Sequence, residues 1–255
     1  MSEAVRVGLA GGVCHIEMAR PEKKNALTAA MYRTMADALA TAEADPAVRV
    51  ILISGAGGNF TAGNDLADFL ETPPMEESAP VFRFIKGFAN LQKPFVAAVE
   101  GVAIGVGTTM LLHCDLVYVS DEGRLAMPFT SLGLVAEFAS SLLLPQRVGR
   151  VKATEKLLLG DPMTGAEAVE LGLANAVLPA AEVLPHARRM AERFNALPPN
   201  AVRETKKLMQ RASRAAVLEQ IGAESQVFTE QLRSPEAREA FQAFFEKRKP
   251  DFSRF

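Results

Sequence analysis

The sequence predicts an α/β fold, in which a layered core of strands and helices is followed by a helical C-terminal region. Short apolar runs alternate with helical periodicity over roughly the first half of the chain, and helical periodicity dominates from about Ser140 onward. The chain has 255 residues and a hydrophobic content of 49%, which is enough for one sizeable core. We therefore expect a core at residues 1–197 and a helical region at residues 198–255, with a hinge at Pro198-Pro199.

Seven apolar runs are expected to be strands. Residues 5–9 and 13–18 flank the turn Gly11-Gly12 and form a hairpin. The run at 48–54 is almost continuously apolar, which is typical of a strand buried on both faces. The remaining strands are expected at 95–99, at 116–120, at 123–127 and, closing the sheet layer, at 174–178.

The helices are predicted from capping residues and periodicity. Thr28 is expected to cap a helix that reaches about Glu43, because Met31, Met35 and Leu39 share one face. Residues 70–80 are rich in Pro, Glu and Ser without periodicity, so we expect a mobile loop there. Further helices are expected at 81–91, through His113 after a glycine-rich opening, and at 200–213, 215–232 and 235–247.

The composition argues against nucleic-acid, membrane and metal partners. The net charge is −2, so no overall field favours nucleic acid or anionic lipid, and no apolar stretch approaches the ~20 residues of a membrane span. His15, His113 and His186 lie far apart and lack the spacing of a helical metal pair. The first residues do not resemble a signal peptide, and Cys14 and Cys114 sit in apolar runs where we expect reduced thiols, so we expect a cytoplasmic protein.

Two glycine-bearing stretches come close to dinucleotide fingerprints and fail. Gly55–Phe60 follows a strand, but Phe60 stands where the third glycine is required, and Gly105–Met110 fails at the same place. The sequence also has no Gly-Lys-Ser/Thr phosphate loop and no Gly-x-Ser-x-Gly elbow. Nucleotide binding through these motifs and serine-hydrolase chemistry are therefore not expected.

Two other segments favour a site that stabilises an oxyanion. Phe60–Leu66 carries Gly63 in a turn of small residues, where the backbone can approach a ligand and aim N–H groups at it, and Asp65 suits a cap of the next turn. Gly101–Gly107 opens a helix, whose N-terminal N–H groups and dipole suit a developing negative charge. Each segment taken alone is equally consistent with a tight turn.

Motifs across the whole chain resemble those of the crotonase (enoyl-CoA hydratase/isomerase) family. Phe60–Leu66 resembles the family's F-x-A-G-x-D-L signature, and Gly101–Gly107 followed by Cys114-Asp115-Leu116 resembles its G-x-A-x-G-x-G…C-D-L segment. Residues 20–27, 157–173 and 244–252 resemble its R-P…N-A-L, T-A-x-E-A…G-L and F-x-E-K-R-x-P-x-F stretches. The ordered set implies a crotonase-like layered (ββα) core with a helical C-terminal trimerisation region.

The resemblance also implies a ligand and site residues. The ligand is an acyl-CoA thioester, whose carbonyl oxygen would accept from the N–H groups of Ala62 and Val106; coenzyme A is part of the substrate and no separate cofactor is implied. Substrate contacts carried over or expected nearby fall on Gly63, Asn64, Asp65, Leu66, Lys24, Phe244 and Lys247. The loop at 67–80 is expected to shape the acyl pocket, and Glu100 and Asp115 are interpreted as structural.

The positions that carry the two glutamates of enoyl-CoA hydratases are Thr109 and Phe129 in this sequence. Neither side chain can act as a carboxylate acid or base, so simple addition of water lacks both groups that would activate and deliver it.

Glu137 is the expected base instead. Pro128–Ser141 resembles a segment of Δ3,Δ2-enoyl-CoA isomerases in which the catalytic glutamate matches Glu137, although Ala136 and Phe138 replace that segment's Pro and Gly. Glu137 is also the only ionisable residue between Arg124 and Arg147, so apolar neighbours should raise its pKa. The other interpretation of Glu137 is an exposed loop residue favoured by the dipole of the next helix.

The sequence-based hypothesis is therefore a one-base isomerisation of 3-enoyl-CoA to 2-trans-enoyl-CoA through a thioester enolate. One alternative is another reaction of the family, such as hydration of an unusual acyl-CoA, dehalogenation or C–C cleavage. The other is a non-catalytic acyl-CoA-binding module that retains only the oxyanion site.

The region after Pro199 is expected to hold a homotrimer or a dimer of trimers. Its apolar residues are too many for an appendage of this length to bury alone. They are Val202, Leu208, Met209, Val217, Leu218, Ile221, Val227, Phe228, Leu232, Phe241, Phe244 and Phe245.

Overall fold

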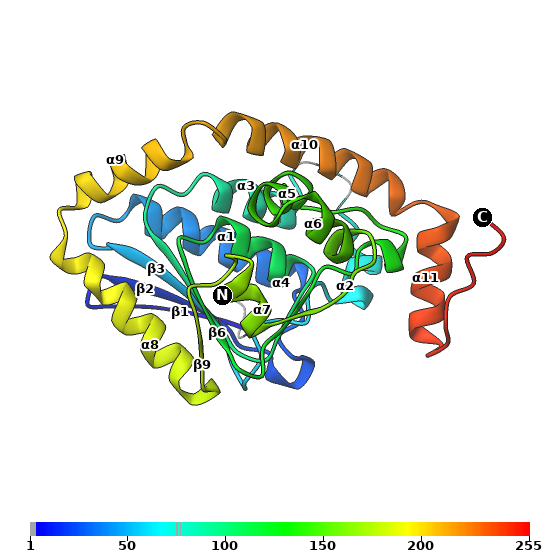
Figure 1. Cartoon of the computed structure of the whole chain (residues 1–255), viewed down its shortest axis with the longest axis horizontal. Helices are drawn as coiled ribbons and strands as arrows, with labels where there is room; N and C mark the ends of the chain where they lie inside the picture. The colour runs from blue at the N-terminus through cyan, green and yellow to red at the C-terminus, as the bar shows by residue number, and fades with distance from the viewer. Residues whose placement is uncertain (1–3, 75, 77) are drawn as a thin grey trace.

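The structure is a computed structural model that describes residues 4–74, 76 and 78–255, and within them the strands form a six-stranded and a three-stranded sheet (Figure 1). The larger sheet has the order β1-β2-β3-β4-β6-β9. Its first pair is antiparallel and all the other neighbours are parallel. Its strands are β1 (Val5–Ala10), β2 (Val13–Met18), β3 (Val50–Gly55), β4 (Phe95–Val99), β6 (Leu116–Ser120) and β9 (Ala176–Leu178). The predicted strands are confirmed, and the run near 174–178 closes the sheet at its edge.

Helices cover both faces of the larger sheet. Alternate residues of β3 point to opposite faces, so that Val50 and Leu52 belong to one apolar cluster while Ile51 and Ile53 belong to another. The first cluster includes Val183, Ala187 and Ala191 of α8 (Ala180–Glu192). The second includes residues of α1 (Ala29–Ala44) and α3 (Pro80–Ala89), which lie on the other side of the sheet in Figure 1. The predicted burial of this strand on both faces is confirmed.

The smaller sheet consists of β5 (Val102–Ile104), β7 (Arg124–Ala126) and β8 (Met163–Thr164), in the order β5-β7-β8. The glycine-rich segment was expected to open a helix directly, but it first forms β5, because β5 pairs with β7 and bridges to Thr61 through Ala103. The helical part follows as α4 (Val106–Thr109) and the 3-10 turn η2 (Met110–His113).

A short helix, α2 (Leu66–Glu71), precedes the expected loop at 70–80 and overlaps its start. The side chain of Asp65 accepts from the N–H groups of Ala67 and Asp68, so the predicted cap is confirmed. Two predictions concern this part of the chain: that residues 70–80 are mobile, and that the loop 67–80 shapes an acyl pocket. Both include residues 75 and 77, which lie outside the described residues, and both stay predictions.

The remaining chain is mainly helical, as expected. Helices α9 (Pro199–Gln210) and α10 (Arg214–Gln231) run along one side of the core (Figure 1). Helix α10 packs on α3 and on α5 (Ser140–Val148), and α11 (Pro235–Phe245) packs on the 3-10 turn η3 (Thr130–Leu132). The predicted division of the chain into two regions at residue 198 stays a prediction. Helices α10 and α11 pack against the core. The other elements are η1 (Pro21–Lys23), α6 (Arg150–Leu157), α7 (Gly165–Glu170) and η4 (Arg193–Ala196). Among the described residues, no helix is long and apolar enough to cross a membrane.

The apolar residues after Pro199 divide into a buried group, an exposed group and three half-buried residues, Val202, Leu218 and Leu232. Part of the predicted excess packs into the chain's own core, because α10 and α11 lie on it; these residues are Val217, Ile221, Phe228 and Phe241. Another part stays exposed, namely Leu208, Met209, Val227, Phe244 and Phe245. The expectation that the chain cannot bury this set is therefore wrong for the first group and holds for the second.

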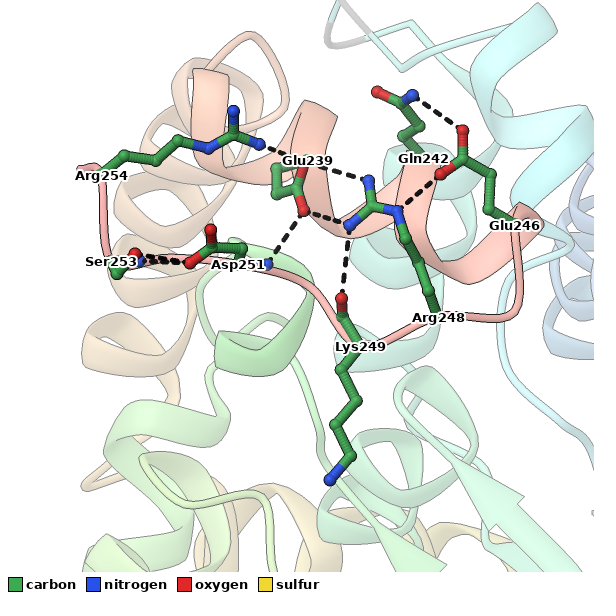
Figure 2. A network of polar contacts seen from close by, with 8 residues as sticks. All are labelled: Glu239, Gln242, Glu246, Arg248, Lys249, Asp251, Ser253 and Arg254. Atoms are coloured by element: carbon green, nitrogen blue, oxygen red, sulfur yellow. Dashed lines mark hydrogen bonds and ion pairs between the residues drawn. The ribbon is translucent and has the colours of Figure 1, made fainter.

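A carboxylate at the centre of a polar network holds the last residues against α11 (Figure 2). Glu239 has a side chain that is only 5% exposed, and it accepts from Arg248 at 2.5 and 3.2 Å and from Arg254 at 3.1 Å. The backbone N–H of Asp251 donates to the same carboxylate at 2.9 Å. The network thus ties the segment 246–255 to the helix that forms one wall of the candidate site described below.

The hydrogen bonds from Arg248, followed by the one from Asp251, lower the pKa of Glu239 to about 2. The carboxylate therefore stabilises the bound segment above the ordinary pKa of a glutamate, and this contribution is lost as the pH falls toward 2.

We expect Glu239→Gln to loosen the segment 246–255 at pH 7, since the amide lacks the charge and one acceptor that bind the two arginines. Hydrogen exchange followed by mass spectrometry should show faster exchange in this segment, by roughly tenfold or more. The matched control is Glu236→Gln, an exposed residue of the same helix. Equal protection of the segment in both variants would contradict this account.

Candidate active site

The two glycine segments meet at a cavity of about 450 Å³. Of the residues expected to form a site, Ala62, Gly63, Asn64, Asp65, Leu66, Val106 and Phe244 line it. Lys24, Lys247 and Glu137 are not among its described lining residues, whereas Lys23 is. Most of the wall is apolar and includes Phe69, Phe129, Leu134, Phe228 and Phe245. Such a cavity suits an apolar ligand with a few polar groups to orient it.

Close backbone approach brings the two segments together. Thr61 and Ala103 form a parallel bridge, with Thr61 N–H donating to Val102 and Ile104 N–H donating to Thr61. Gly63 has φ +86°, and a Cβ there would lie 2.8 Å from the carbonyl oxygen of Ile104. A Cβ on Gly107 would lie 2.5 Å from the side chain of Thr61. Side chains at these two glycines would push the segments apart, so the sequence places glycine where the approach requires it.

Hydrogen-bond accounting corrects one of the two predicted oxyanion donors. The N–H of Ala62 donates to the carbonyl of Lys24 at 2.9 Å, so it is already used. The N–H of Asn64, two residues on, has no partner among the described residues, and neither has the N–H of Val106. Val106 is the first residue of α4, where the N–H lacks a helical acceptor. The candidate donor pair is therefore Asn64 and Val106, both of which line the cavity.

The turn before α1 explains why the N–H of Ala62 is occupied. Lys24 and Asn25 have positive φ values of 47° and 56°. Asn25 is fully buried, and its side-chain amide donates to the carbonyls of Ala56 and Asn59 while its side-chain oxygen accepts from the N–H of Arg20. This arrangement fixes the Lys24 carbonyl against the 60–66 segment. Lys24 therefore acts here through its backbone, and its predicted substrate contact has no support in the cavity lining.

Asp65 lines the cavity and also stabilises the local structure through an ion pair and a helix cap. Besides capping α2, it accepts from Arg20 Nη1 at 2.6 Å. Burial alone would raise the pKa of Asp65, but the hydrogen bonds from Arg20 and from the N–H groups of Asp68 and Ala67 outweigh it and lower the pKa. The Arg20–Asp65 pair thus connects the opening R-P motif with the segment that carries Asn64.

The two hydratase positions hold side chains that cannot transfer protons to water. Thr109 is fully buried, and its hydroxyl donates to the carbonyl of Val106 within the same helix. Phe129 is 5% exposed and lines the cavity. The structure thus fills these two places with a hydroxyl bound to backbone and an aromatic ring.

Glu137 is buried, with 6% of its surface exposed, so the alternative of an exposed loop residue is excluded. Burial, and then the negative charge of Glu224, raise the pKa of Glu137 to about 8. Its Oε1 atom has no hydrogen-bond partner among the described residues, and the same is true of the neighbouring Ser140 Oγ. A buried carboxyl without a partner, with a pKa near neutrality, has the properties of a general base.

The two residues that follow Glu137 adopt an uncommon backbone conformation. Phe138 and Ala139 have φ values of +59° and +55°, which non-glycine residues rarely adopt. Nε2 of His113 donates to the Phe138 carbonyl at 2.7 Å, and the two rings stack with centroids 4.2 Å apart. His113, from the 3-10 turn η2, thus holds this turn through both the carbonyl and the ring of Phe138.

Tyr32 contacts the segment that carries the candidate donor Asn64. Its hydroxyl donates to the side-chain oxygen of Asn64. Burial, and then the charge of Glu137, raise the pKa of Tyr32 well above its usual value. No sequence motif marked Tyr32, whose only signal was its place on the apolar face of α1.

Four other predicted residues have clear positions. Phe244 lines the cavity and is 57% exposed, whereas Lys247 lies beyond α11 with φ +54° and does not reach the lining. Asp115 is structural, as expected: it accepts from the N–H of Phe95 and from Lys206 Nζ. Glu100 is partly buried, and burial raises its pKa. Within the described part of the chain, no group of three or more His, Cys, Asp or Glu side chains is placed to bind a metal.

Comparison with known proteins places this arrangement in a family. The family described as enoyl-CoA hydratase/isomerase matches residues 8–254. Enoyl-CoA delta isomerase 2 of Rattus norvegicus is 37% identical over 82% of this chain, which spans only 55% of that protein's length. A probable enoyl-CoA hydratase of Bacillus subtilis is 31% identical over 89% of this chain and 90% of its own length.

Solved structures agree with this result. Pseudomonas aeruginosa OdaA is 50% identical, with a TM-score of 0.93, and the match covers 95% of this chain and 99% of that one. The fold, the order of the motifs and the geometry of the glycine segments lead to the same conclusion: the chain belongs to the enoyl-CoA hydratase/isomerase (crotonase) family.

Proposed function

We propose that this protein isomerises 3-enoyl-CoA thioesters to 2-trans-enoyl-CoA thioesters, with Glu137 as the single base. The observation that carries the proposal is the buried Glu137 carboxyl, which has a pKa of about 8 and an Oε1 atom with no partner among the described residues. The cavity adds two backbone N–H groups, of Asn64 and Val106, that have no partner among the same residues. Thr109 and Phe129 at the hydratase positions favour isomerisation over the addition of water.

The proposed reaction consists of two proton transfers. The N–H groups of Asn64 and Val106 donate to the thioester oxygen, and each such donor contributes roughly 10²–10³ in rate. Glu137 removes a proton from C2, and the electron pair moves onto the thioester oxygen to give a dienolate. The same carboxyl then returns the proton to C4, and the double bond moves from C3–C4 to C2–C3. Atoms and charge balance without a cofactor.

The relatives carry names of both kinds, enoyl-CoA delta isomerase and probable enoyl-CoA hydratase. We therefore base the choice between isomerase and hydratase activity on the side chains at the site.

Cys14 and Cys114 form no disulfide, which suits a reducing compartment and supports our proposal that the protein acts in the cytoplasm.

A panel of substrates tests the proposal against its alternatives. We expect purified protein to convert 3-hexenoyl-CoA to a conjugated thioester, with a rise in ultraviolet absorbance, and to hydrate crotonyl-CoA negligibly. Hydration at a rate matching isomerisation would show that water is activated by other groups. Binding of these thioesters with no turnover of any of them would favour the non-catalytic module.

Glu137→Gln should lower the isomerase kcat by roughly 10²-fold or more, because the amide cannot accept the C2 proton. Affinity for coenzyme A should change little, since the amide has nearly the size of the carboxyl and both N–H donors are kept. Steady-state kinetics and calorimetric titration measure the two quantities. A variant with near wild-type kcat would remove Glu137 from the mechanism.

Val106→Pro removes the candidate N–H donor at the first position of a helix, where proline is tolerated. It also replaces a buried side chain, so a folded variant by circular dichroism is a condition of the test. We expect kcat/KM to fall by roughly 10²–10³. Val106→Ala, which shortens the side chain but keeps the N–H group, is the matched control and should retain most activity. Equal activities of the two variants would mean that this N–H does not contact the thioester.

We also propose that the protein is a homotrimer or a dimer of trimers, formed through the exposed apolar residues of the C-terminal helices. Leu208 and Met209 on α9 are 66% and 78% exposed, and apolar patches of this kind usually mark an interface. Light scattering should give three or six times the 27.4 kDa mass of the chain. A mass of one chain at micromolar concentration would contradict the proposal.

A further inference from the structure

Glu224 on α10 contacts the turn that carries Glu137, although it lies 85 positions after Ala139 in the sequence. One carboxylate oxygen accepts from the N–H of Ala139 at 2.5 Å. The other accepts from the N–H of Ser141 at 3.0 Å and from its hydroxyl at 2.5 Å. Glu224 is itself buried, with 6% of its surface exposed.

The turn needs such a partner for two reasons. Phe138 and Ala139 have positive φ values, so the local chain does not favour this conformation by itself. Ala139 is also the N-cap residue of α5, and its methyl group cannot accept from the N–H groups at the start of the helix. Glu224 takes over that function from a distant part of the chain.

The hydrogen-bond pattern favours the ionised form of Glu224, because all three contacts are donors to its carboxylate oxygens. Burial raises the pKa of Glu224, and the hydrogen bonds from Ser141 and Ala139 act in the opposite direction. Gln220, one turn earlier on α10, donates to the Ser141 hydroxyl at 2.8 Å, which orients that hydroxyl toward Glu224.

We propose that Glu224 is a positioning residue for Glu137: its carboxylate holds the 137–141 turn, and its negative charge keeps the Glu137 carboxyl a strong base. This inference rests on the proposed function, in which Glu137 removes the C2 proton. It gives α10, which already contributes Phe228 to the cavity wall, a second role at the proposed site.

The titratable groups that face the Glu137 turn from the packed elements are Tyr32 on α1, His113 on η2 and Glu224 on α10. Burial lowers the pKa of His113 to about 4 and raises that of Tyr32 well above its usual value, so both are neutral near pH 7. Among the described residues, Glu224 is therefore the charged group that acts on Glu137.

Two variants separate charge from position. Glu224→Gln removes the charge, and we expect the acidic limb of the kcat/KM profile for 3-hexenoyl-CoA to move to lower pH by roughly one unit. Glu224→Asp keeps the charge but reaches less far, so we expect an unshifted limb and a plateau kcat that is lower by roughly tenfold. The matched control is Glu219→Gln, an exposed residue of the same helix that should behave like the wild type.

An unshifted limb in Glu224→Gln would overturn the role of the charge, even if activity fell, because a merely structural residue would leave the limb in place. A wild-type plateau in Glu224→Asp would overturn the positional role. If Glu224→Gln does not fold, Glu224→Asp decides: a wild-type plateau, or a limb shifted to lower pH, contradicts the proposal.

A second readout keeps this inference distinct from the proposed function. The protonated carboxyl of Glu137 can be titrated by infrared difference spectroscopy, with Glu137→Gln as the blank. We expect it to ionise at lower pH in Glu224→Gln than in the wild type, whether or not the protein isomerises any thioester. No wild-type turnover would reject the proposed function alone, and an unchanged titration would reject the role of Glu224 alone.

Discussion

The candidate site depends on the close contact between the segments around Gly63 and Gly107. Each glycine faces an atom of the other segment at a distance that excludes a side chain, the Ile104 carbonyl in one case and the Thr61 side chain in the other. The contact places the start of α4 beside the 60–66 turn. The N–H groups of Asn64 and Val106 at the cavity have no partner among the described residues. Such fixed donors need no reorganisation when charge develops on a bound oxygen.

A second constraint is the burial of two carboxyl groups within electrostatic range. Glu224 is compensated by three donors, whereas Glu137 has one oxygen without a partner and a pKa of about 8. Two positive φ angles follow Glu137, and conformations of this kind cost about 1–3 kcal/mol each. The chain retains this strained turn because His113 and Glu224 hold it from two different elements, so that α10 contacts the turn that carries Glu137.

The sequence predicted most of the fold and part of the site. Strands such as β3 were predicted because alternate burial on two faces requires a continuous apolar run, and the burial of Glu137 followed from its apolar neighbours. The donor at Ala62 was wrong because the carbonyl that occupies its N–H belongs to Lys24, whose left-handed turn depends on the distant contacts of Asn25. Tyr32 and Glu224 could not be identified, since their roles arise from packing between elements far apart in the chain.

In the proposed reaction, the buried carboxyl of Glu137 removes the proton from C2 and returns it to C4. The most direct test is to isomerise 3-hexenoyl-CoA that carries deuterium at C2, in ordinary water, and to locate the label in the product by NMR. Because Glu137 is 6% exposed, the account predicts that a substantial share of the deuterium removed from C2 appears at C4. Complete loss of the transferred label to solvent would contradict a single buried base and would indicate two exchangeable groups or a water-filled site.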